Sequence, residues 1–211
     1  MYIKKRDFTA SKSNLVVLFL LPFIISLCFS LQRINEHQQH VDKIIRIEKE
    51  VHLSIHISSF IHELQKERGA SGVYLSSEGE KFSNEIIDQR KKTDEAYARL
   101  SLRIASFVKH AYPDKFNVLL SNSLRFQDYF NDLREEILSL SIPVKQAIDY
   151  YSAINRHFLD TIAAIAIDSP EPSLMRGLLS YTYLLRGKEL AGIERALLSS
   201  TFTQEYFSKG D

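Results

Sequence analysis

The sequence has few residues that break helices, almost no cysteine and almost no net charge. Its 7 glycines and 5 prolines among 211 residues favour long helices over a strand-and-turn protein. A single cysteine, Cys28, excludes an intramolecular disulfide framework and a cysteine-based zinc site. The formal net charge of +1 gives no general reason to expect a nucleic-acid or membrane-surface partner. The domain is therefore expected to be stabilised by packing alone.

Charged residues are also missing from a run near the N-terminus, Leu15 to Leu31. Its 17 residues are just long enough to cross the hydrocarbon core of a membrane as a helix. A short basic flank stays in the cytoplasm, and the flank before this run contains Lys4, Lys5, Arg6 and Lys12. The sequence therefore predicts a cytoplasmic tail (1–14), a transmembrane helix (15–31) and an exported domain (32–211).

Two other interpretations of this apolar run are less favoured. A cleaved signal peptide normally has small residues at the −3 and −1 positions, whereas this run ends CFSLQ with no Ala-x-Ala site. A lipoprotein would use Cys28, but Leu27 stands where a small residue is needed. An uncleaved anchor is the preferred interpretation, and the signal peptide is the main alternative.

From Gln32 onward the sequence has helical periodicity, and no segment sustains the two-residue alternation of a strand. Ser141-Ile142-Pro143 and Ser169-Pro170 resemble N-caps followed by an early-turn proline. The predicted helices end near Leu75, Ala111, Leu140, Ile167 and Phe202. Because long helices joined by short turns prefer antiparallel neighbours, the predicted fold class is all-α, an up-and-down helical bundle of the four-helix type with one N-terminal transmembrane helix.

One arginine falls on the apolar stripe of the first exported helix. At about 100° per residue, Arg68 and Ser71 share an arc of about 100° with the apolar residues of that helix, which are Leu53, Ile57, Phe60, Ile61, Leu64 and Leu75. A guanidinium that projects from the core face of a helix is costly unless it is paired. Either a carboxylate meets Arg68 inside the bundle, or the arginine receives an anionic ligand. The plainer alternative is that Arg68 extends outward past its neighbours or pairs with Glu67.

Two glycines follow this arginine. Gly69 and Gly72 each cost about 1 kcal/mol relative to alanine inside a helix. They are useful where a backbone must approach a neighbouring helix or a ligand closely. Their position therefore favours a binding function for Arg68.

The last predicted helix carries two further cations, Lys188 and Arg195, two turns apart with Gly192 beside them. They belong to a stripe with three-four spacing, formed by Tyr181, Leu184, Lys188, Ala191, Arg195 and Leu198. A second stripe on the same helix is apolar, formed by Leu179, Leu190, Ile193 and Leu197. A helix that is apolar on two sides is either enclosed within the bundle or faces a second subunit.

If the first and last helices are neighbours, Arg68 and Arg195 converge on one small anion. A guanidinium presents paired donors in one plane, which match two oxygens of a carboxylate, nitrate or nitrite. The sequence therefore predicts a small-oxyanion site between these two helices.

Three segments resemble the signatures of a known family. LQKERGASGVYL, from Leu64 to Leu75, is similar to the N-terminal signature of the nitrate- and nitrite-sensing (NIT) domain family. Gln89-Arg90 followed by Thr93-Asp94 is similar to its second-helix pattern, and KELAGIERA, from Lys188, to its late signature. The three occur in the order of the family and cover a core of about 51–202.

The resemblance implies an all-helical sensor that binds nitrate or nitrite through arginines. In bacteria such domains precede the output modules of membrane receptors such as chemoreceptors, histidine kinases and diguanylate cyclases. By motif, Arg68 and Arg195 match the arginines that contact the anion, and a homodimer is expected. The candidate supporting residues are Ser71, Gly69, Gly72, Lys188 and Gly192, with Arg176 and Arg186 as further candidates.

The leading hypothesis is an extracytoplasmic domain that binds nitrate or nitrite for transmembrane signalling, anchored in the bacterial inner membrane with its C-terminal domain in the periplasm. No second membrane helix or effector follows before Asp211, so we expect the N-terminal part of a truncated receptor, a degenerate gene product or a stand-alone binding protein. The alternative is a structural or partner-binding helical membrane protein in which Arg68 and Arg195 form internal salt bridges.

Several functions are not expected. No pair of a general base and a nucleophile is apparent, so the chain is predicted not to be an enzyme and to need no cofactor. His52 and His56 have the spacing of metal ligands on a helix but no apparent third ligand, so no metal site is predicted. No basic run accompanies the aromatic residues, so no nucleic-acid partner is predicted.

Overall fold

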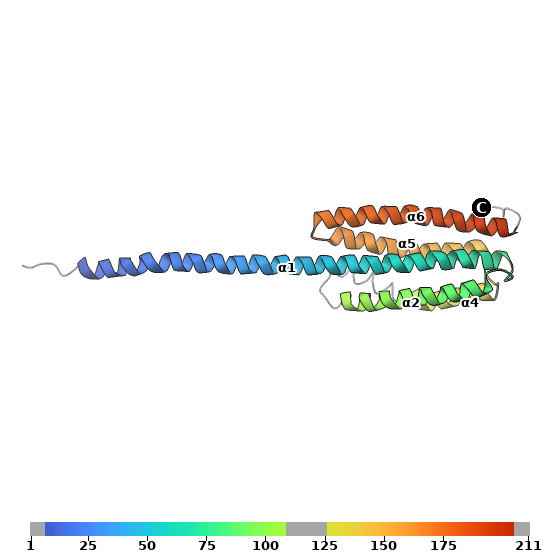
Figure 1. Cartoon of the computed structure of the whole chain (residues 1–211), viewed down its shortest axis with the longest axis horizontal. Helices are drawn as coiled ribbons and strands as arrows, with labels where there is room; N and C mark the ends of the chain where they lie inside the picture. The colour runs from blue at the N-terminus through green and yellow to red at the C-terminus, as the bar shows by residue number, and fades with distance from the viewer. Residues whose placement is uncertain (1–6, 109–125, 205–211) are drawn as a thin grey trace, which may run out of the picture. The chain divides into compact units, whose positions relative to one another are not determined.

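The computed structural model describes the backbone of residues 7–108 and 126–204, and the side chains of residues 19–106 and 130–203. The elements are α1 (Asp7–Ser76), α2 (Ser83–Val108), α4 (Phe126–Leu138), α5 (Val144–Asp168) and α6 (Pro172–Gln204). No strand occurs in these ranges, so the predicted all-α class is confirmed. The chain divides into two compact units, Met1–Arg46 and Ile47–Asp211, and the helical bundle is formed within the second (Figure 1).

The first unit contains the N-terminal part of α1, whose large apolar side chains between Phe19 and Leu31 are exposed. Among the described residues, no helix is both apolar and long enough to cross a membrane. The transmembrane helix predicted at 15–31 is therefore not observed. The predicted run is at the short limit for a span, and Pro22 interrupts it. Residues 1–6 of the predicted tail, and the side chains of 15–18, lie outside the described residues.

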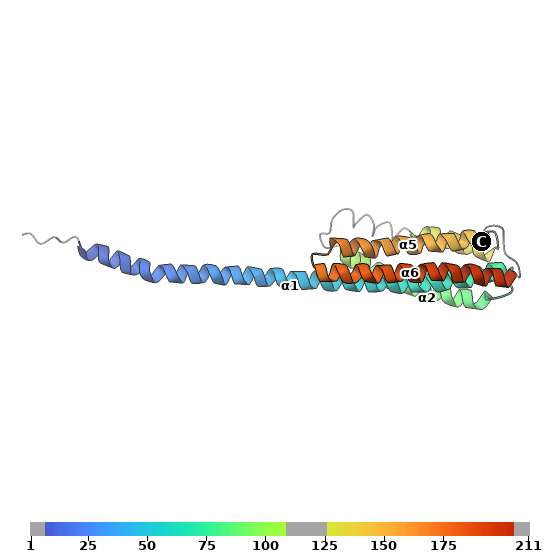
Figure 2. The ribbon, with the colours of Figure 1, turned by 90° about the horizontal axis from the view of Figure 1, so that it is seen from above.

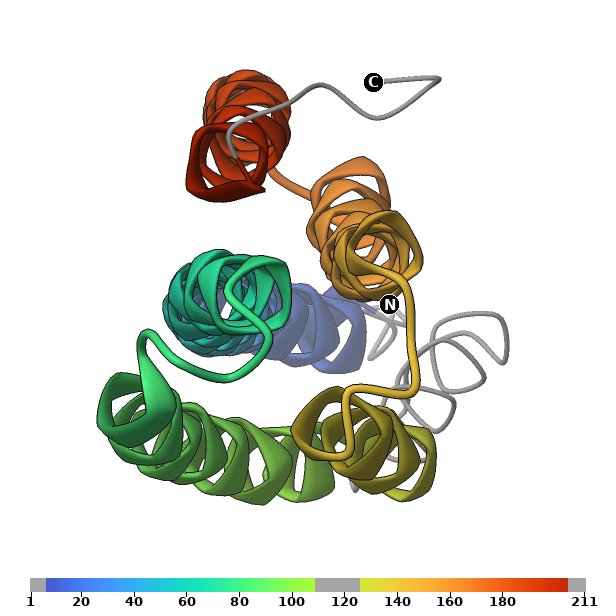
Figure 3. The ribbon, with the colours of Figure 1, turned by 90° about the vertical axis from the view of Figure 1, so that its right-hand side faces the viewer.

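In the second unit, the C-terminal part of α1 lies between two pairs of helices. Seen end-on, α2 and α4 lie on one side of α1, and α5 and α6 on the other (Figure 3). The same helices run alongside one another in the perpendicular views of Figures 1 and 2. Both faces of α1 are therefore covered by other helices in this unit.

Contacts along the bundle give the direction of each helix. On α2, Gln89 contacts Glu63, whereas the later Arg103 contacts the earlier His56, so α2 is antiparallel to α1. Helix α4 is parallel to α1, because Glu67 contacts Arg134 and the later Tyr74 contacts the later Leu138. Helix α6 is also parallel, because Ser58 contacts Tyr181 and Gln65 contacts Glu189. Helix α5 is antiparallel, because Arg68 contacts Ser152 and the later Gly72 faces the earlier Ile148. The predicted up-and-down arrangement is observed, with five helices in the described ranges.

The core follows the arc predicted for α1. The apolar residues of this arc are almost fully buried. They belong to one core cluster with residues of α2, α4, α5 and α6, including Ile86, Leu100, Ile104, Leu133, Ile137, Tyr151, Phe158, Ile162 and Leu185. Phe60 packs edge-on against Phe158, with 5.0 Å between ring centroids. The core is therefore continuous across α1 and joins the two helix pairs.

The predicted N-caps are wrong in detail. The N-cap of α5 is Pro143, in an extended conformation, and no side chain caps this helix end. Ser141 instead donates its hydroxyl hydrogen bond to the carbonyl of Glu136, at 3.2 Å, near the end of α4. Ser169 is the C-cap of α5, and α6 begins at Pro172. The hydroxyl of Ser169 accepts a hydrogen bond of 3.5 Å from the backbone N–H of Glu171, so only the hydroxyl of Ser141 bonds to the end of the preceding helix.

Candidate functional site

Arg68 lies in the interior of the bundle, at the place where α1 faces both α5 and α6. Its side chain is 1% exposed, although it is among the largest side chains in the core. Its Nη1 forms an ion pair with Oε1 of Glu189 on α6 and donates a hydrogen bond of 2.9 Å to Oγ of Ser152 on α5. The predicted burial of Arg68 on the core face of α1 is confirmed.

The carboxylate of Glu189 is surrounded by donors from three helices. Its Oε1 accepts from Arg68, while its Oε2 accepts from Nε2 of Gln65 at 2.7 Å and from Nδ2 of Asn155 at 3.1 Å. Glu189, Gln65 and Asn155 are all buried. A planar group with two oxygens is therefore held by one guanidinium and two amides in a dry environment, where charge-assisted hydrogen bonds are strong.

Two buried polar atoms in this cluster have no hydrogen-bond partner among the described residues. They are Nε of Arg68 and Oδ1 of Asn155. Leaving a buried donor or acceptor unpaired costs about 1–3 kcal/mol. The cluster therefore keeps one free donor and one free acceptor beside the Glu189 carboxylate.

Of the three glycines predicted at the site, one has no room for a side chain. A Cβ added at Gly192 would lie 2.8 Å from Nη2 of Arg68, so a side chain there would displace the guanidinium. A Cβ at Gly72 would lie 3.8 Å from Ile148 and 3.9 Å from the carbonyl of Ala196, which is ordinary contact. At Gly69 an added Cβ would meet nothing within 4 Å. Only Gly192 is needed for room around Arg68.

The other predicted site residues lie in different surroundings. Ser71 is buried and its hydroxyl lies 3.2 Å from the hydroxyl of Tyr151. Lys188 is exposed, and its Nζ lies 3.1 Å from Nδ1 of His62. Burial, together with the charges of Lys188 and Lys66, lowers the pKa of His62. Arg195 is exposed on α6. The structure therefore places Gly192 beside the buried Arg68, whereas the two cations of α6 are exposed.

The two stripes of α6 explain this difference. The buried face of α6 is a third one, which carries Leu178, Thr182, Leu185, Glu189, Ala196, Ser200 and Thr201. Several members of the two predicted stripes are exposed, among them Leu184, Leu190 and Leu198. Periodicity alone selected faces rich in large apolar residues, whereas the buried face combines two leucines with small and polar residues.

A second buried charge cluster lies on the opposite side of α1, facing α2 and α4. Glu67 is fully buried and accepts two hydrogen bonds from Arg134, at 2.8 and 2.9 Å. Arg90 lies 3.7 Å from the same carboxylate, and Tyr151 donates to it at 2.9 Å. Asp94 accepts from Nη1 of Arg134 at 2.7 Å. This cluster ties α1 to three neighbouring helices.

Burial and charge shift the pKa values in this second cluster. Burial, together with the negative charge of Glu67, raises the pKa of Tyr151 well above its usual value. Burial lowers the pKa of Arg90. Burial also favours a lower pKa for Arg134, but the hydrogen bonds to Glu67 and Asp94 outweigh this effect. The pKa of Arg134 is therefore raised. Tyr151 is therefore neutral and Arg134 is firmly charged at neutral pH.

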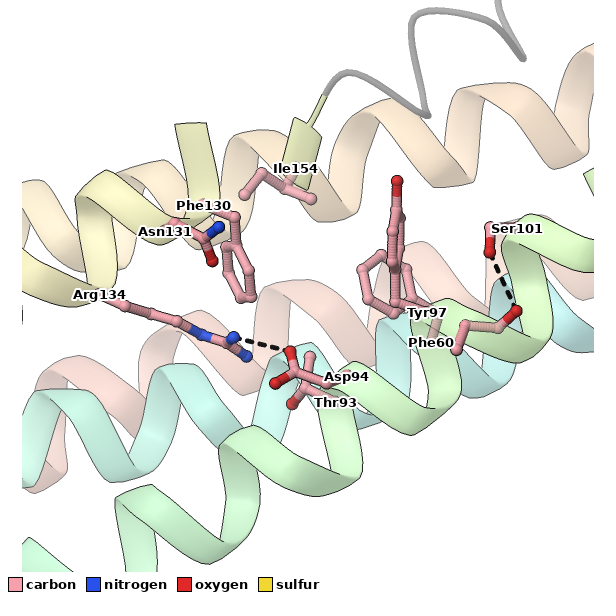
Figure 4. Close-up of a pocket in the computed structure, with 10 residues that line it drawn as sticks. Phe60, Thr93, Asp94, Tyr97, Ser101, Phe130, Asn131, Arg134 and Ile154 are labelled. Carbon is pink, nitrogen blue, oxygen red and sulfur yellow. Dashed lines mark hydrogen bonds and ion pairs between the residues drawn. The ribbon is translucent and has the colours of Figure 1, made fainter. Parts of the chain in front are cut away.

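A pocket of about 220 Å³ opens beside Arg134 (Figure 4). Its lining comes from α1, α2, α4 and α5 and includes the rings of Phe60, Tyr97 and Phe130. The guanidinium at its end already binds the carboxylates of Glu67 and Asp94. Because Glu67 and Asp94 already compensate the charge of Arg134, the pocket does not favour an oxyanion.

The sequence analysis did not predict that Glu189, Gln65 and Asn155 form a cluster of a carboxylate and its donors. Gln65 is part of the first signature segment, and Asn155 follows an apolar residue on α5. Single amides in helices are common at the surface, so no signal in the sequence marked these two as buried. No group of three or more metal-ligating side chains is found in the described part of the chain.

Comparison with known proteins identifies the family from a large part of the chain. A family model described as nitrate and nitrite sensing matches residues 59–211. A nitrate regulatory protein of Klebsiella oxytoca is 25% identical over 187 residues, which are 89% of this chain and 46% of that protein. The solved structure of the NasR transcription antiterminator aligns with a TM-score of 0.74 at 25% identity, over 80% of this chain and 46% of that one. The chain thus spans about half the length of these relatives.

These findings overturn two of the predictions. The extracytoplasmic receptor for transmembrane signalling is wrong, because the relatives are a regulatory protein and a transcription antiterminator. The periplasmic, single-pass inner-membrane localisation is wrong for the same reason, and the described helices contain no membrane span. The prediction of no nucleic-acid partner conflicts with a relative that acts in transcription antitermination. The apolar run at 15–31 and its basic flank led to the receptor interpretation.

Proposed function

The chain belongs to the nitrate- and nitrite-sensing family, and on this premise we propose that it binds nitrate or nitrite at Arg68, between α1, α5 and α6. The observation that carries the proposal is a fully buried guanidinium on the core face of α1, held next to a planar pair of carboxylate oxygens. Nitrate and nitrite are also planar and present oxygens at similar angles, so the same donors fit them. The dry surroundings strengthen each of these contacts.

Arg195 is the second arginine of the proposed site. It is exposed on α6, three residues after Gly192, which approaches the Arg68 guanidinium. An arginine side chain is long and flexible, and it can fold its stem along an apolar surface. In this proposal Arg195 closes over the anion from the α6 side, with Ser71 and Lys188 in supporting positions.

The proposed outcome of binding is a regulatory change in helix packing, as the relatives are regulators. An anion that contacts α1, α5 and α6 at one level favours one arrangement of these helices over another. A non-catalytic role also belongs to this proposal. The output to transcription is proposed by likeness to the antiterminator, which shares 46% of its length with this chain.

We also propose that the chain forms a homodimer through the outer face of α6. The outer face of α6 carries five exposed large apolar side chains: Tyr183, Leu184, Leu190, Leu198 and Phe202. An exposed apolar patch of this kind is typical of a protein–protein interface, and the commonest symmetric arrangement is a two-fold dimer.

A structural role is the second candidate, and the Arg68–Glu189 ion pair favours it. Under this alternative Arg68 and Glu189 are a buried pair that fixes the packing of α1 against α6, with no exogenous ligand. Buried pairs of this kind are often retained for specificity of packing rather than stability. The second arginine does not fit this alternative, because Arg195 is exposed.

Calorimetry on the full chain distinguishes the two functions. Nitrate and nitrite are titrated against chloride at equal ionic strength, with Arg68→Lys as the test variant and Arg156→Lys, an exposed arginine on α5, as the control. Lysine keeps the charge but loses the planar fork, so nitrate affinity is expected to fall by at least about tenfold in Arg68→Lys and to stay unchanged in the control. Absence of nitrate and nitrite binding to the wild-type chain at about 1 mM, or equal binding to both variants, contradicts the proposal.

A further inference from the structure

We infer that the Glu189 carboxylate is a built-in occupant of the oxyanion site, which nitrate or nitrite must displace in order to bind. This inference rests on the proposed function. The carboxylate is itself a planar group with two oxygens, and its partners are the guanidinium of Arg68 and the amides of Gln65 and Asn155. These are the donors that a free planar oxyanion needs. Glu189 therefore sits in the position of the ligand.

Charge balance requires displacement rather than addition. Arg68 and Glu189 form a neutral pair, with exposures of 1% and 8% for their side chains. Arg68 is the buried cation of this cluster and Arg195 is exposed, so a second anion added beside Glu189 would place a second negative charge in the interior against one buried positive charge. An anion that replaces Glu189 leaves the charge of the cluster unchanged. Exchange of one anion for another is therefore the less costly route.

The positions of the two partners indicate which one moves. Ser152 accepts from Arg68 and donates to the carbonyl of Ile148 at 2.7 Å, so the hydroxyl holds the guanidinium in place from α5. Glu189 lies nearer to the surface than Arg68. The carboxylate is thus the group that leaves, and its departure frees the amide donors of Gln65 and Asn155 for the ligand.

Displacement of Glu189 also gives the site its link to packing. The contacts of Glu189 join α6 to Gln65 on α1 and to Asn155 on α5. When a free anion takes the carboxylate's place, the hydrogen bonds of Gln65 and Asn155 go to that anion and no longer join α1 and α5 to α6. The hold of α1 and α5 on α6 is therefore weakened at this level when ligand binds. Glu189 sets both the affinity of the site and the mechanical consequence of binding.

Nitrate calorimetry on the full chain tests the inference with Glu189→Gln and, as a matched control, Glu194→Gln. Glu194 is an exposed glutamate on the same helix, so its variant has the same charge change. Glutamine lacks the charge that competes for Arg68, so nitrate affinity is expected to rise by about tenfold in Glu189→Gln. Glu194→Gln is expected to match the wild type.

The outcomes separate the inference from the proposed function. If the wild type binds nitrate and Glu189→Gln binds it equally or more weakly, displacement is wrong while the proposed function stands. If only Glu189→Gln binds nitrate, both are overturned for the wild-type chain, because nitrate then fails to displace the carboxylate. If neither binds, both are overturned.

A second variant covers the case in which Glu189→Gln fails to fold. Glu189→Ala removes the carboxylate and leaves its place open to a small free carboxylate. Formate is expected to raise the melting temperature of Glu189→Ala but not of the wild type, at matched chloride concentrations. Nitrate is expected to compete with formate for the same variant. Equal effects of formate on both chains would overturn the inference, because they would mean that no oxyanion position opens when Glu189 is removed.

Discussion

At the scale of single residues, two neighbouring residues of α1 carry buried charges of opposite sign toward different helices. Glu67 faces the arginines of α2 and α4, and Arg68 faces the carboxylate on α6. Each is buried, and each has an oppositely charged partner. Two adjacent residues of a helix project about 100° apart, so one short segment of α1 connects both pairs of flanking helices.

Arg134 has one buried and one exposed carboxylate partner, and their contributions to the free energy of unfolding are expected to differ. Glu67→Gln leaves Arg134 and Arg90 beside an uncharged side chain in the interior, and the free energy of unfolding is expected to fall by about 3 kcal/mol or more. Asp94→Asn removes the other carboxylate bound to Arg134, but that side chain is 61% exposed, so the loss is expected to stay below about 1 kcal/mol. Urea denaturation followed by circular dichroism gives both values. Equal losses would mean that burial of Glu67 adds nothing to the pair.

The residue patterns on α1 were predictable, and those on its partners were not. A guanidinium within an apolar stripe is a strong signal because few alternatives to pairing exist for it, and Arg68 is buried as predicted. Gln65 lies at the edge of the same stripe, and its burial depends on the approach of α6. No property of a single helix carries that information, so the donors around the Glu189 carboxylate could be identified only from the structure.

At the scale of helices, α6 limits what periodicity can predict. Its buried face contains Thr182, Glu189, Ser200 and Thr201 as well as two leucines, while five large apolar residues are exposed on its outer face. A search for apolar stripes therefore selects the wrong side of this helix. Lys188 and Arg195 were placed on a core stripe for this reason, and both are exposed.

Two glycines of α6 give a matched test of its approach to α1. An added Cβ at Gly187 meets nothing within 4 Å, so Gly187→Ala is expected to stabilise the fold by up to about 1 kcal/mol through helix propensity. At Gly192 the added Cβ lies 2.8 Å from Nη2 of Arg68, which Glu189 and Ser152 hold in place. Gly192→Ala is therefore expected to be less stable than Gly187→Ala by about 1 kcal/mol or more, because the guanidinium must shift away from its partners.

Thermal unfolding of the two glycine variants and the wild type measures this difference. Equal stabilisation by both alanines would mean that the Arg68 guanidinium moves aside at no cost. In that case Gly192 is dispensable for the site, and nitrate binding should be unaffected by its replacement.

At the scale of the whole molecule, the second unit encloses α1 between two helix pairs (Figure 3). The charged clusters on α1 face both pairs, so a change at Arg68 is next to contacts that reach α2, α4, α5 and α6. The all-α class and the alternating helix directions were predictable from periodicity and turn residues. The membrane interpretation was not correct, because the length and apolarity of a short run do not establish its environment.

The outer face of α6 provides the last prediction, which concerns assembly. If two copies meet through this face in a two-fold dimer, residues near the axis lie close to their own equivalents. Cys28 is the only cysteine, so a Cys28→Ser background permits single-site cross-linking. In that background Leu190→Cys, on the outer face of α6, is expected to give a cross-linked dimer with a short bis-maleimide. Leu102→Cys is the control, because Leu102 is similarly exposed but lies on α2. Equal cross-linking at both positions would indicate random collision and contradict the α6 interface.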